Sequence, residues 1–243
     1  MGEEQVLLVD KPAGLSSFGV VGRVRYFLSQ RAGHKVKVGH TGTLDPFATG
    51  LLILLTGKAT KRSNEFLKLD KEYVATVKFG FVSTTGDTEG EITPYGGRSS
   101  GLSLQADSLN EARKPQLPLN EVIPPSQDTI SKLLSESFTG EITQTPPAYS
   151  AIKINGQRAY KLARAGKQVE MPSREVTIYE IEILEYKWSE LVLRVKCSSG
   201  TYIRSLAADI GEALGVGAYL TALRRTKVGV YGVEDAHDLD FFA

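Results

Sequence analysis

The chain has 243 residues, of which 41% are hydrophobic and 23% are charged, a composition typical of a globular protein with a sizeable core. Its single cysteine, Cys197, cannot form an internal disulfide, which excludes the small disulfide-stabilised class and fits a reducing cytoplasm. The longest apolar run, residues 51–55, is far too short to span a bilayer, so we expect no membrane segment.

The net charge is only +1, but the charge is unevenly distributed along the chain. Residues 1–75 contain eleven Lys and Arg against seven Asp and Glu, residues 139–175 contain six against three, and residues 194–227 contain six against two. If these basic segments meet on one face, they form a surface for a polyanion such as a nucleic acid. The alternative is solvated charge scattered over the surface, which the charge pattern alone favours.

The first third of the chain combines strand and helix patterns with a glycine-rich loop. Ser16 or Ser17 can cap a helix, because apolar residues follow at helical spacing over residues 20–28. The predicted elements, in chain order, are a buried strand at 5–9, a turn at 11–14, this helix, a loop at 39–50, an apolar strand at 51–55, a short helix at 59–67 and a strand at 73–79.

Residues 83–127 are rich in Ser, Gly, Pro and Asn, which predicts a low-complexity surface insertion rather than a linker. Residues 139–174 read as a polar and basic excursion. The remaining predicted elements are a helix at 128–138, a short helix at 157–165, strands at 176–186 and 191–197, a helix at 202–214, a helical turn carrying Leu220 and Leu223, and a strand at 226–231. This mixture predicts a single α+β domain over 1–243, with a mixed, largely antiparallel central sheet flanked by helices.

The most informative stretch is the predicted loop at residues 39–50, GHTGTLDPFATG. Glycine supplies unusual backbone angles and proline fixes φ, so this composition is typical of a loop. Its only carboxylate, Asp45, lies among amides and hydroxyls, as a nucleophile or a base would. The alternative is an Asx-turn or a helix cap, the commonest use of Asp before Pro. The functional interpretation needs an ionised carboxylate, and we expect a nearby cation to hold the pKa of Asp45 down.

Two further features of the sequence argue against nucleotide hydrolysis and against a metal site. Gly57 and Lys58 resemble the end of a phosphate-binding loop, but the preceding glycine is Gly50 and no Ser or Thr follows the lysine, which disfavours nucleotide hydrolysis. No cluster of His, Cys and carboxylates has metal-ligand spacing, so we expect no metal. His40 is open to three interpretations: a surface residue, an anchor of the loop, or a contact to a substrate base.

Tyr73 and Arg204 are the other candidate site residues. Tyr73 begins a strand, where it is either a packing aromatic or a stacking platform whose phenol can take part in proton transfer. Arg204 falls in the first turn of a predicted helix, where the helix dipole mildly disfavours a cation. A buried carboxylate would compensate, and Asp45 is the natural candidate.

At these positions the chain resembles the TruB family of tRNA pseudouridine synthases. The matching blocks, in family order, are Lys11-Pro12-Ala13-Gly14-Leu15-Ser16-Ser17, the catalytic loop Gly39-His40-Thr41-Gly42-Thr43-Leu44-Asp45-Pro46, Lys71-Glu72-Tyr73, the RNA-clamping segment Pro147-Ala148-Tyr149-Ser150-Ala151-Ile152-Lys153, Gly200-Thr201-Tyr202-Ile203-Arg204, and residues 220–225. Together they run from Leu8 to about Val230, which is nearly the whole chain.

The resemblance implies the pseudouridine synthase fold with a central cleft, and conversion of a tRNA uridine, at position 55 in the T arm, to pseudouridine without cofactor or metal. Asp45 would act on the ribose of a flipped-out uridine as nucleophile or as base, a choice the sequence leaves open. Arg204 would keep Asp45 ionised, Tyr73 would stack on the uracil, and Leu223 would line the pocket. The other substrate-binding residues implied are His40, Gly42, Thr43, Lys11, Tyr202 and Lys153.

The resemblance also implies a partner, the T-arm stem-loop of tRNA, and a cytoplasmic monomer with no obligate protein partner. Two features depart from the family: we expect no C-terminal RNA-binding domain, and residues 98–127 are longer and richer in Gly, Ser and Pro than usual. Two rival functions stay open. One is a guide-dependent synthase acting on ribosomal RNA, and the other is an RNA-binding module on the same fold without catalysis.

Overall fold

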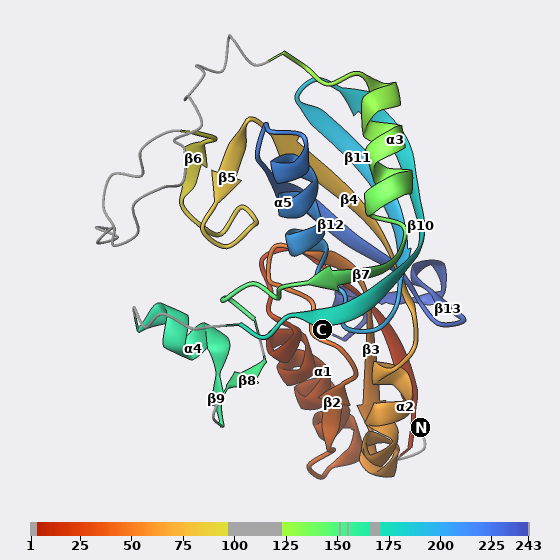
Figure 1. Cartoon of the computed structure of the whole chain (residues 1–243). Coiled ribbons are helices and arrows are strands. Elements are labelled where there is room, and N and C mark those ends of the chain that lie inside the picture. The colour runs from red at the N-terminus through yellow and green to blue at the C-terminus, as the bar shows by residue number, and fades with distance from the viewer. Residues whose placement is uncertain (1–3, 97–122, 151, 155, 166–170, 243) are drawn as a thin grey trace.

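The computed structural model describes residues 4–96, 123–150, 152–154, 156–165 and 171–242. Within them, one mixed sheet of ten strands has the order β14-β1-β3-β12-β4-β11-β10-β7, with β13 paired to β12 and β2 paired to β3 (Figure 1). The strands are β1 (Val6–Lys11), β2 (Val38–His40), β3 (Thr49–Thr56), β4 (Lys71–Phe79), β7 (Gly140–Gln144), β10 (Arg174–Lys187), β11 (Glu190–Cys197), β12 (Ala218–Val228), β13 (Tyr231–Gly232) and β14 (His237–Asp238). Only the β1–β14 and β3–β12 pairs are parallel. The predicted α+β class with a largely antiparallel sheet is therefore confirmed.

Helices flank this sheet. α5 (Ile203–Ala213) packs on β12 and β4, α3 (Gln127–Ser137) contacts β10, and α1 (Ser17–Ala32) lies beside β2 (Figure 1). α1 begins where the sequence predicts, because the Ser16 hydroxyl accepts a hydrogen bond from the Gly19 amide. The shorter helices are η1 (Gly57–Arg62), α2 (Ser63–Leu67), α4 (Ala159–Arg164), η3 (Val233–Asp235) and η4 (Leu239–Phe242). Of the helices in the described ranges, none has the length and apolar character needed to cross a membrane.

Strand β3 is buried on both faces, because its continuous apolar run places hydrophobic side chains on each side of the sheet. Leu52 and Leu54 point into the main hydrophobic core, which includes residues of β4, β11, β12 and α5. The alternate residues Leu51, Ile53 and Leu55 point the other way, into a smaller cluster beside α2. The loop that precedes β3 is therefore attached to one of the most firmly packed strands of the molecule.

Two short ribbons project from one side of the molecule, at the left of Figure 1. One pairs β5 (Phe81–Ser83) with β6 (Ile92–Pro94), and the other pairs β8 (Lys153–Ile154) with β9 (Gln157–Arg158), which leads into α4. Residues 97–122 of the predicted insertion at 83–127 lie outside the described residues. The predicted excursion at 139–174 begins with β7, an edge strand of the sheet, so the chain leaves the sheet only after Gln144. The predicted domain boundaries stay predictions.

The predicted helical turn around Leu220 and Leu223 is wrong. Both residues lie in β12, which pairs with β4 along most of its length and with β3 at Arg224 and Arg225. Cross-strand pairing and burial in the middle of a sheet override a short local pattern. The helix predicted at 59–67 is divided into η1 and α2, and the one predicted at 157–165 begins only at Ala159, after β9.

Candidate active site

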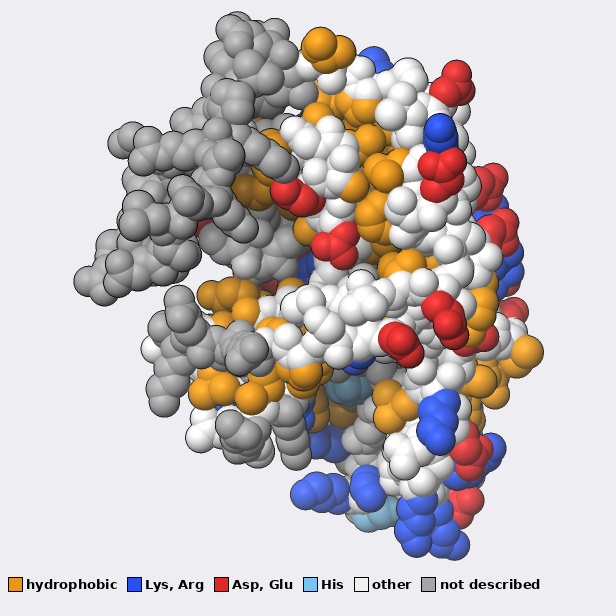
Figure 2. Space-filling view, in the orientation of Figure 1, with side chains coloured by type: hydrophobic (Ala, Val, Ile, Leu, Met, Phe, Trp, Pro, Cys, Tyr) orange, Lys and Arg blue, Asp and Glu red, His pale blue; other side chains and the backbone are white. Residues whose placement is uncertain are grey.

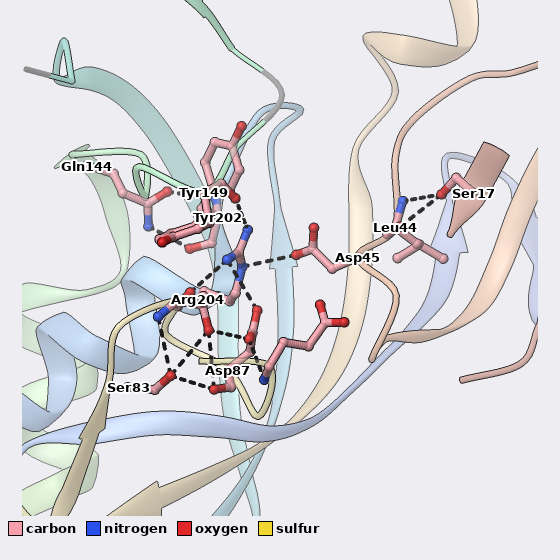
Figure 3. A network of polar contacts seen from close by, with 11 residues as sticks. Ser17, Leu44, Asp45, Ser83, Asp87, Gln144, Tyr149, Tyr202 and Arg204 are labelled. Carbon is pink, nitrogen blue, oxygen red and sulfur yellow. Dashed lines mark hydrogen bonds and ion pairs between the residues drawn. The ribbon is translucent and has the colours of Figure 1, made fainter. Parts of the chain in front are cut away.

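The glycine-rich loop joins β2 to β3 and is held by the N-terminal motif. The buried Ser17 hydroxyl donates to the Leu44 carbonyl at 2.9 Å and accepts from the Leu44 amide at 2.8 Å (Figure 3). The Gly14 amide donates to the Pro46 carbonyl at 2.8 Å. These bonds lie on both sides of Asp45 in the sequence, so the side chain of Asp45 projects from a fixed backbone.

Lys11 contributes to the same anchoring. Its side chain is completely buried, and its Nζ donates to the carbonyls of Pro12, Leu15 and Pro46 at 2.8, 2.7 and 3.1 Å. Burial lowers the pKa of Lys11 from 10.5 to about 8, and the nearby charge of Asp45 opposes this effect. The sequence predicts a substrate-binding residue here, but this position is that of an anchor for the loop.

Asp45 faces Arg204, as the sequence predicts. The Arg204 Nε lies 3.0 Å from Oδ2 of Asp45, whose side chain is one-third exposed, whereas the side chain of Arg204 is 4% exposed (Figure 3). The guanidinium also donates to the backbone carbonyls of Thr85 and Tyr149, at 2.7 and 2.9 Å. Arg204 is thus fixed by three separate parts of the chain and presents its charge to the loop.

Asp87 is a site residue that sequence reasoning missed. Its Oδ2 lies 3.2 Å from Nη1 of Arg204, and its side chain is only 2% exposed. Its Oδ1 accepts from the Thr85 hydroxyl and the Glu89 amide. Arg204 therefore bridges two carboxylates (Figure 3). The available signal was the acidic residue after the turn at residues 83–86, because a buried arginine often has more than one acidic partner.

The pKa of Asp45 is raised, which is opposite to the expected direction. Burial is the largest cause, and the negative charge of Asp87 adds to it. Arg204 and Lys11 act in the opposite direction, as the sequence predicts for a nearby cation, but they do not outweigh burial. The environment therefore weakens the solvation of the carboxylate while Arg204 keeps it oriented.

Tyr73 and Leu223 lie on neighbouring central strands. Tyr73 is in β4 and Leu223 is in β12, and their side chains are 9% and 7% exposed. In the β4–β12 register Leu223 lies opposite Ala75, two residues along from Tyr73, so both side chains are on one face of the sheet. Burial raises the pKa of Tyr73, and Arg225 partly opposes this increase. The phenol is therefore held in its neutral form.

His40 is a partly buried residue at the end of β2. Its ring meets the exposed ring of Phe18 edge-on, with centroids 5.3 Å apart, and its Nδ1 accepts a long hydrogen bond from the Gly42 amide, at 3.4 Å. Burial lowers the pKa of His40, and the charges of Arg225 and Arg158 add to this effect.

The remaining predicted substrate-binding residues have different surroundings. Gly42 has a φ of +151° and its carbonyl accepts from Arg225, and Thr43 is exposed at the loop surface. The backbone of Tyr202 exchanges two hydrogen bonds with the Gln144 side chain, and its ring lies 4.7 Å below the Arg174 guanidinium. Lys153 is in β8, and its side chain is outside the described residues.

The surface carries its charges in groups. Figure 2 shows Lys and Arg side chains gathered at the lower end, where Figure 1 has the ends of α1, β2 and α2, and acidic side chains nearer the middle. The prediction that the three basic segments form one continuous face stays a prediction. In the part of the chain that the structure describes, no group of three or more His, Cys, Asp or Glu is placed to hold a metal ion.

Comparison with solved structures identifies the class of protein. The structure "Crystal Structure of a Cbf5-Nop10-Gar1 Complex" matches with a TM-score of 0.67 and 29% identity, over 99% of this chain and 54% of that chain. The structure "Structure of H/ACA RNP bound to a substrate RNA containing 2'-deoxyuridine" matches with a TM-score of 0.63 and 28% identity, over 98% of this chain and 51% of that chain. The chain has the pseudouridine synthase fold.

The chain belongs to the TruB family. The family model "TruB family pseudouridylate synthase (N terminal domain)" matches residues 29–125 and 101–203, and the model "tRNA pseudouridylate synthase B C-terminal domain" matches residues 204–242. The second segment contains α5 and β12, which are integral to the main sheet and its core. The expectation that no further RNA-binding domain follows stays a prediction.

Curated relatives support the same assignment. The "tRNA pseudouridine synthase B" of Bacteroides fragilis is 46% identical over 99% of this chain and 93% of the relative. The enzymes of the same name from Francisella philomiragia and Bifidobacterium longum are 44% and 42% identical, over 97% and 95% of this chain. The chain spans 68% and 64% of the length of those two relatives.

Proposed function

We propose that this chain isomerises a uridine of tRNA to pseudouridine, with position 55 in the T arm as the target. The observation that carries the proposal is the 3.0 Å ion pair between Asp45 and Arg204, two residues from motifs far apart in the sequence. In this proposal Tyr73 and Leu223, which are buried on one face of the central strands, line the pocket around the pair. The relatives named tRNA pseudouridine synthase B supply the substrate class.

In the proposed reaction the N1–C1′ bond of uridine breaks, the uracil rotates, and C5 bonds to C1′ while the proton on C5 is lost and N1 regains one. Asp45 acts at C1′ as a nucleophile or at C2′ as a base. Both roles need the carboxylate in its ionised form, and both benefit from a partly dehydrated anion that Arg204 orients. The buried phenol of Tyr73 provides a face on which the rotating uracil stacks.

Substrate binding in this proposal combines the loop with the β8–β9 ribbon. The target base has to leave its stack to reach Asp45, so a residue at the rim of the site must contact the base or fill the space that it leaves. His40 has the position and the neutral ring for this role. The basic side chains of the ribbon contact the phosphates of the RNA arm, so binding should weaken as salt increases.

The test is a tritium-release assay on a T-arm stem-loop labelled at C5 of uridine. The wild-type chain should release tritium, and a transcript with its target uridine replaced should not. Asp45→Ala should abolish turnover while RNA affinity stays within about tenfold, or about 1.4 kcal/mol. Asp10→Asn, which changes a carboxylate paired with Arg224, is the matched control and should retain activity.

The outcomes separate this proposal from its two rivals. RNA binding without tritium release from the wild type would favour a binding module without catalysis. Activity only in the presence of a guide RNA and protein partners would favour a guide-dependent synthase. The higher identity to tRNA pseudouridine synthase B, 46% over nearly the whole chain, favours action on tRNA without protein partners. A monomer in size-exclusion chromatography would agree with this proposal.

A further inference from the structure

Arg225 is a buried arginine that the reaction proposed above leaves unused. It lies in the centre of β12 with a side chain that is 3% exposed. Its Nε donates to the Leu51 carbonyl at 2.8 Å, and its Nη2 donates to the Gly42 carbonyl at 3.2 Å. Arg225 is also the cross-strand neighbour of Tyr73 in the β4–β12 pairing. One side chain therefore connects β3, the glycine-rich loop and the central tyrosine.

The charge of Arg225 has an unusual environment. Arg204 has two carboxylate partners and Arg224 pairs with Asp10 through two hydrogen bonds, but no carboxylate in the described residues forms an ion pair with Arg225. A buried cation without an acidic partner is destabilising, and its hydrogen bonds to carbonyls offset only part of that cost. Such a cost suggests a role other than stability.

The backbone around Arg225 is arranged to allow this contact. In the two strand pairings Arg225 lies opposite Gly50 of β3 and opposite Tyr73 of β4. A Cβ at Gly50 would lie 2.3 Å from the Arg225 carbonyl oxygen, so only glycine permits this close approach. A register irregularity follows between Arg225 and Lys227, where an extra residue changes the direction of the strand.

We propose that Arg225 is a positioning residue for the reaction, because it holds the Gly42 carbonyl of the loop next to its cross-strand neighbour Tyr73. This inference rests on the proposed function. Gly42 is three residues before Asp45, so its carbonyl determines where the loop turns toward the substrate. Because Arg225 also lies beside Tyr73 in the sheet, it fixes the loop relative to the ring on which the uracil would stack.

The first test compares Arg225→Met with Arg224→Met. Arg224 is the adjacent residue, its side chain is 42% exposed, and it lies outside the site, so it reports the cost of losing an arginine from β12. In single-turnover assays on the T-arm stem-loop, Arg225→Met should lose at least about 30-fold in rate, and Arg224→Met should keep the wild-type rate within about threefold. RNA affinity should stay within about threefold in both variants, because Arg225 is buried.

The second test asks whether Arg225 acts through Tyr73. Arg225→Met and Tyr73→Leu, which removes the ring, should be non-additive, with the double variant losing much less than the product of the single losses. Arg225→Lys should recover part of the rate, because an ammonium keeps the charge but lacks the planar fork. If Arg225→Met does not fold, Arg225→Lys replaces it in both tests. A wild-type rate in the folded lysine variant, additivity with Tyr73→Leu, or a loss that appears only as weaker RNA binding would overturn the inference.

Hydrogen exchange keeps this inference distinguishable from the proposed function. Without any RNA, the amides of residues 39–50 should exchange at least about tenfold faster in Arg225→Met than in Arg224→Met. Equal protection of the loop in the two variants would overturn the positioning role even if the wild type proves active. Conversely, a wild type that releases no tritium would overturn the proposed function and leave the exchange result as the measure of loop positioning.

Discussion

Replacing Asp87 by Asn removes one of the two carboxylates that Arg204 bridges. The Asp87–Arg204 pair is separated by 3.2 Å, and the two side chains are 2% and 4% exposed. At an effective dielectric constant of about 20, two charges at that distance attract by about 5 kcal/mol before desolvation. Breaking a buried pair typically costs about 3–5 kcal/mol, and the lower end applies here because Arg204 keeps Asp45. A loss of about 3 kcal/mol corresponds to a decrease of about 6–12 °C in Tm.

The same substitution should alter the pH dependence of activity. The charge of Asp87 helps to raise the pKa of Asp45, so removing it should lower that pKa. Because the reaction needs ionised Asp45, activity should then persist to lower pH than in the wild type. Calorimetry measures the change in Tm. Single-turnover rates on the T-arm stem-loop between pH 4 and pH 8, in steps of about half a pH unit, show in which direction the acid limb of the activity profile moves.

Asp10→Asn is the control for Asp87→Asn. It removes a carboxylate from a partly exposed pair with Arg224, so it should cost less than about 1 kcal/mol and leave the acid limb of the pH profile in place. An unchanged Tm in Asp87→Asn, or an acid limb that moves to higher pH, would refute the reasoning about the bridged carboxylates.

Three further predictions concern stability. Gly50→Ala should leave little folded protein, whereas Gly14→Ala should have a milder effect. Both glycines have a positive φ, but only at Gly50 would an added Cβ collide with backbone atoms. Circular dichroism of the purified variants compares the two effects. Ser17→Ala should lower the free energy of unfolding in urea by about 1–3 kcal/mol, because it removes two buried hydrogen bonds to the loop, and an unchanged value would contradict this anchoring role. Burial lowers the pKa of Lys71 from 10.5 to about 8. Between these two pH values the unfolded chain holds a proton that the folded chain has lost, so this group increases the free energy of unfolding as pH rises. Lys71→Met should remove this contribution to the pH dependence of the free energy of unfolding, measured by urea titration at pH 8 and pH 10.

Much of the architecture could be predicted from the sequence because it depends on local patterns. The apolar run of β3 indicated a strand, and the serines before α1 indicated where that helix begins. The glycine and proline content of residues 39–50 indicated the loop that carries Asp45. The segment around Leu223 was misassigned because its conformation depends on pairing with β3 and β4, which no local pattern reports.

The candidate site divides in the same way. The sequence identified Asp45, Tyr73 and Arg204 as chemically suited residues, and even the pairing of Asp45 with Arg204, because a cation in the first turn of a helix needs a partner. It gave no sign that Arg225 lies beneath the loop, since an arginine in a basic stretch looks like a surface residue until its strand is placed in the centre of a sheet.

The amino-acid sequence by itself determined the kinds of element, the family motifs and the reactive side chains of this protein, because composition and spacing are properties of the chain alone. Only the tertiary structure decided that Asp87 is the second partner of Arg204, that Lys11 is buried as an anchor, and that the pKa of Asp45 is raised. The physical reason is that burial and the proximity of charges depend on which distant segments fold against one another, and these two quantities set both the protonation and the orientation of the side chains in the site.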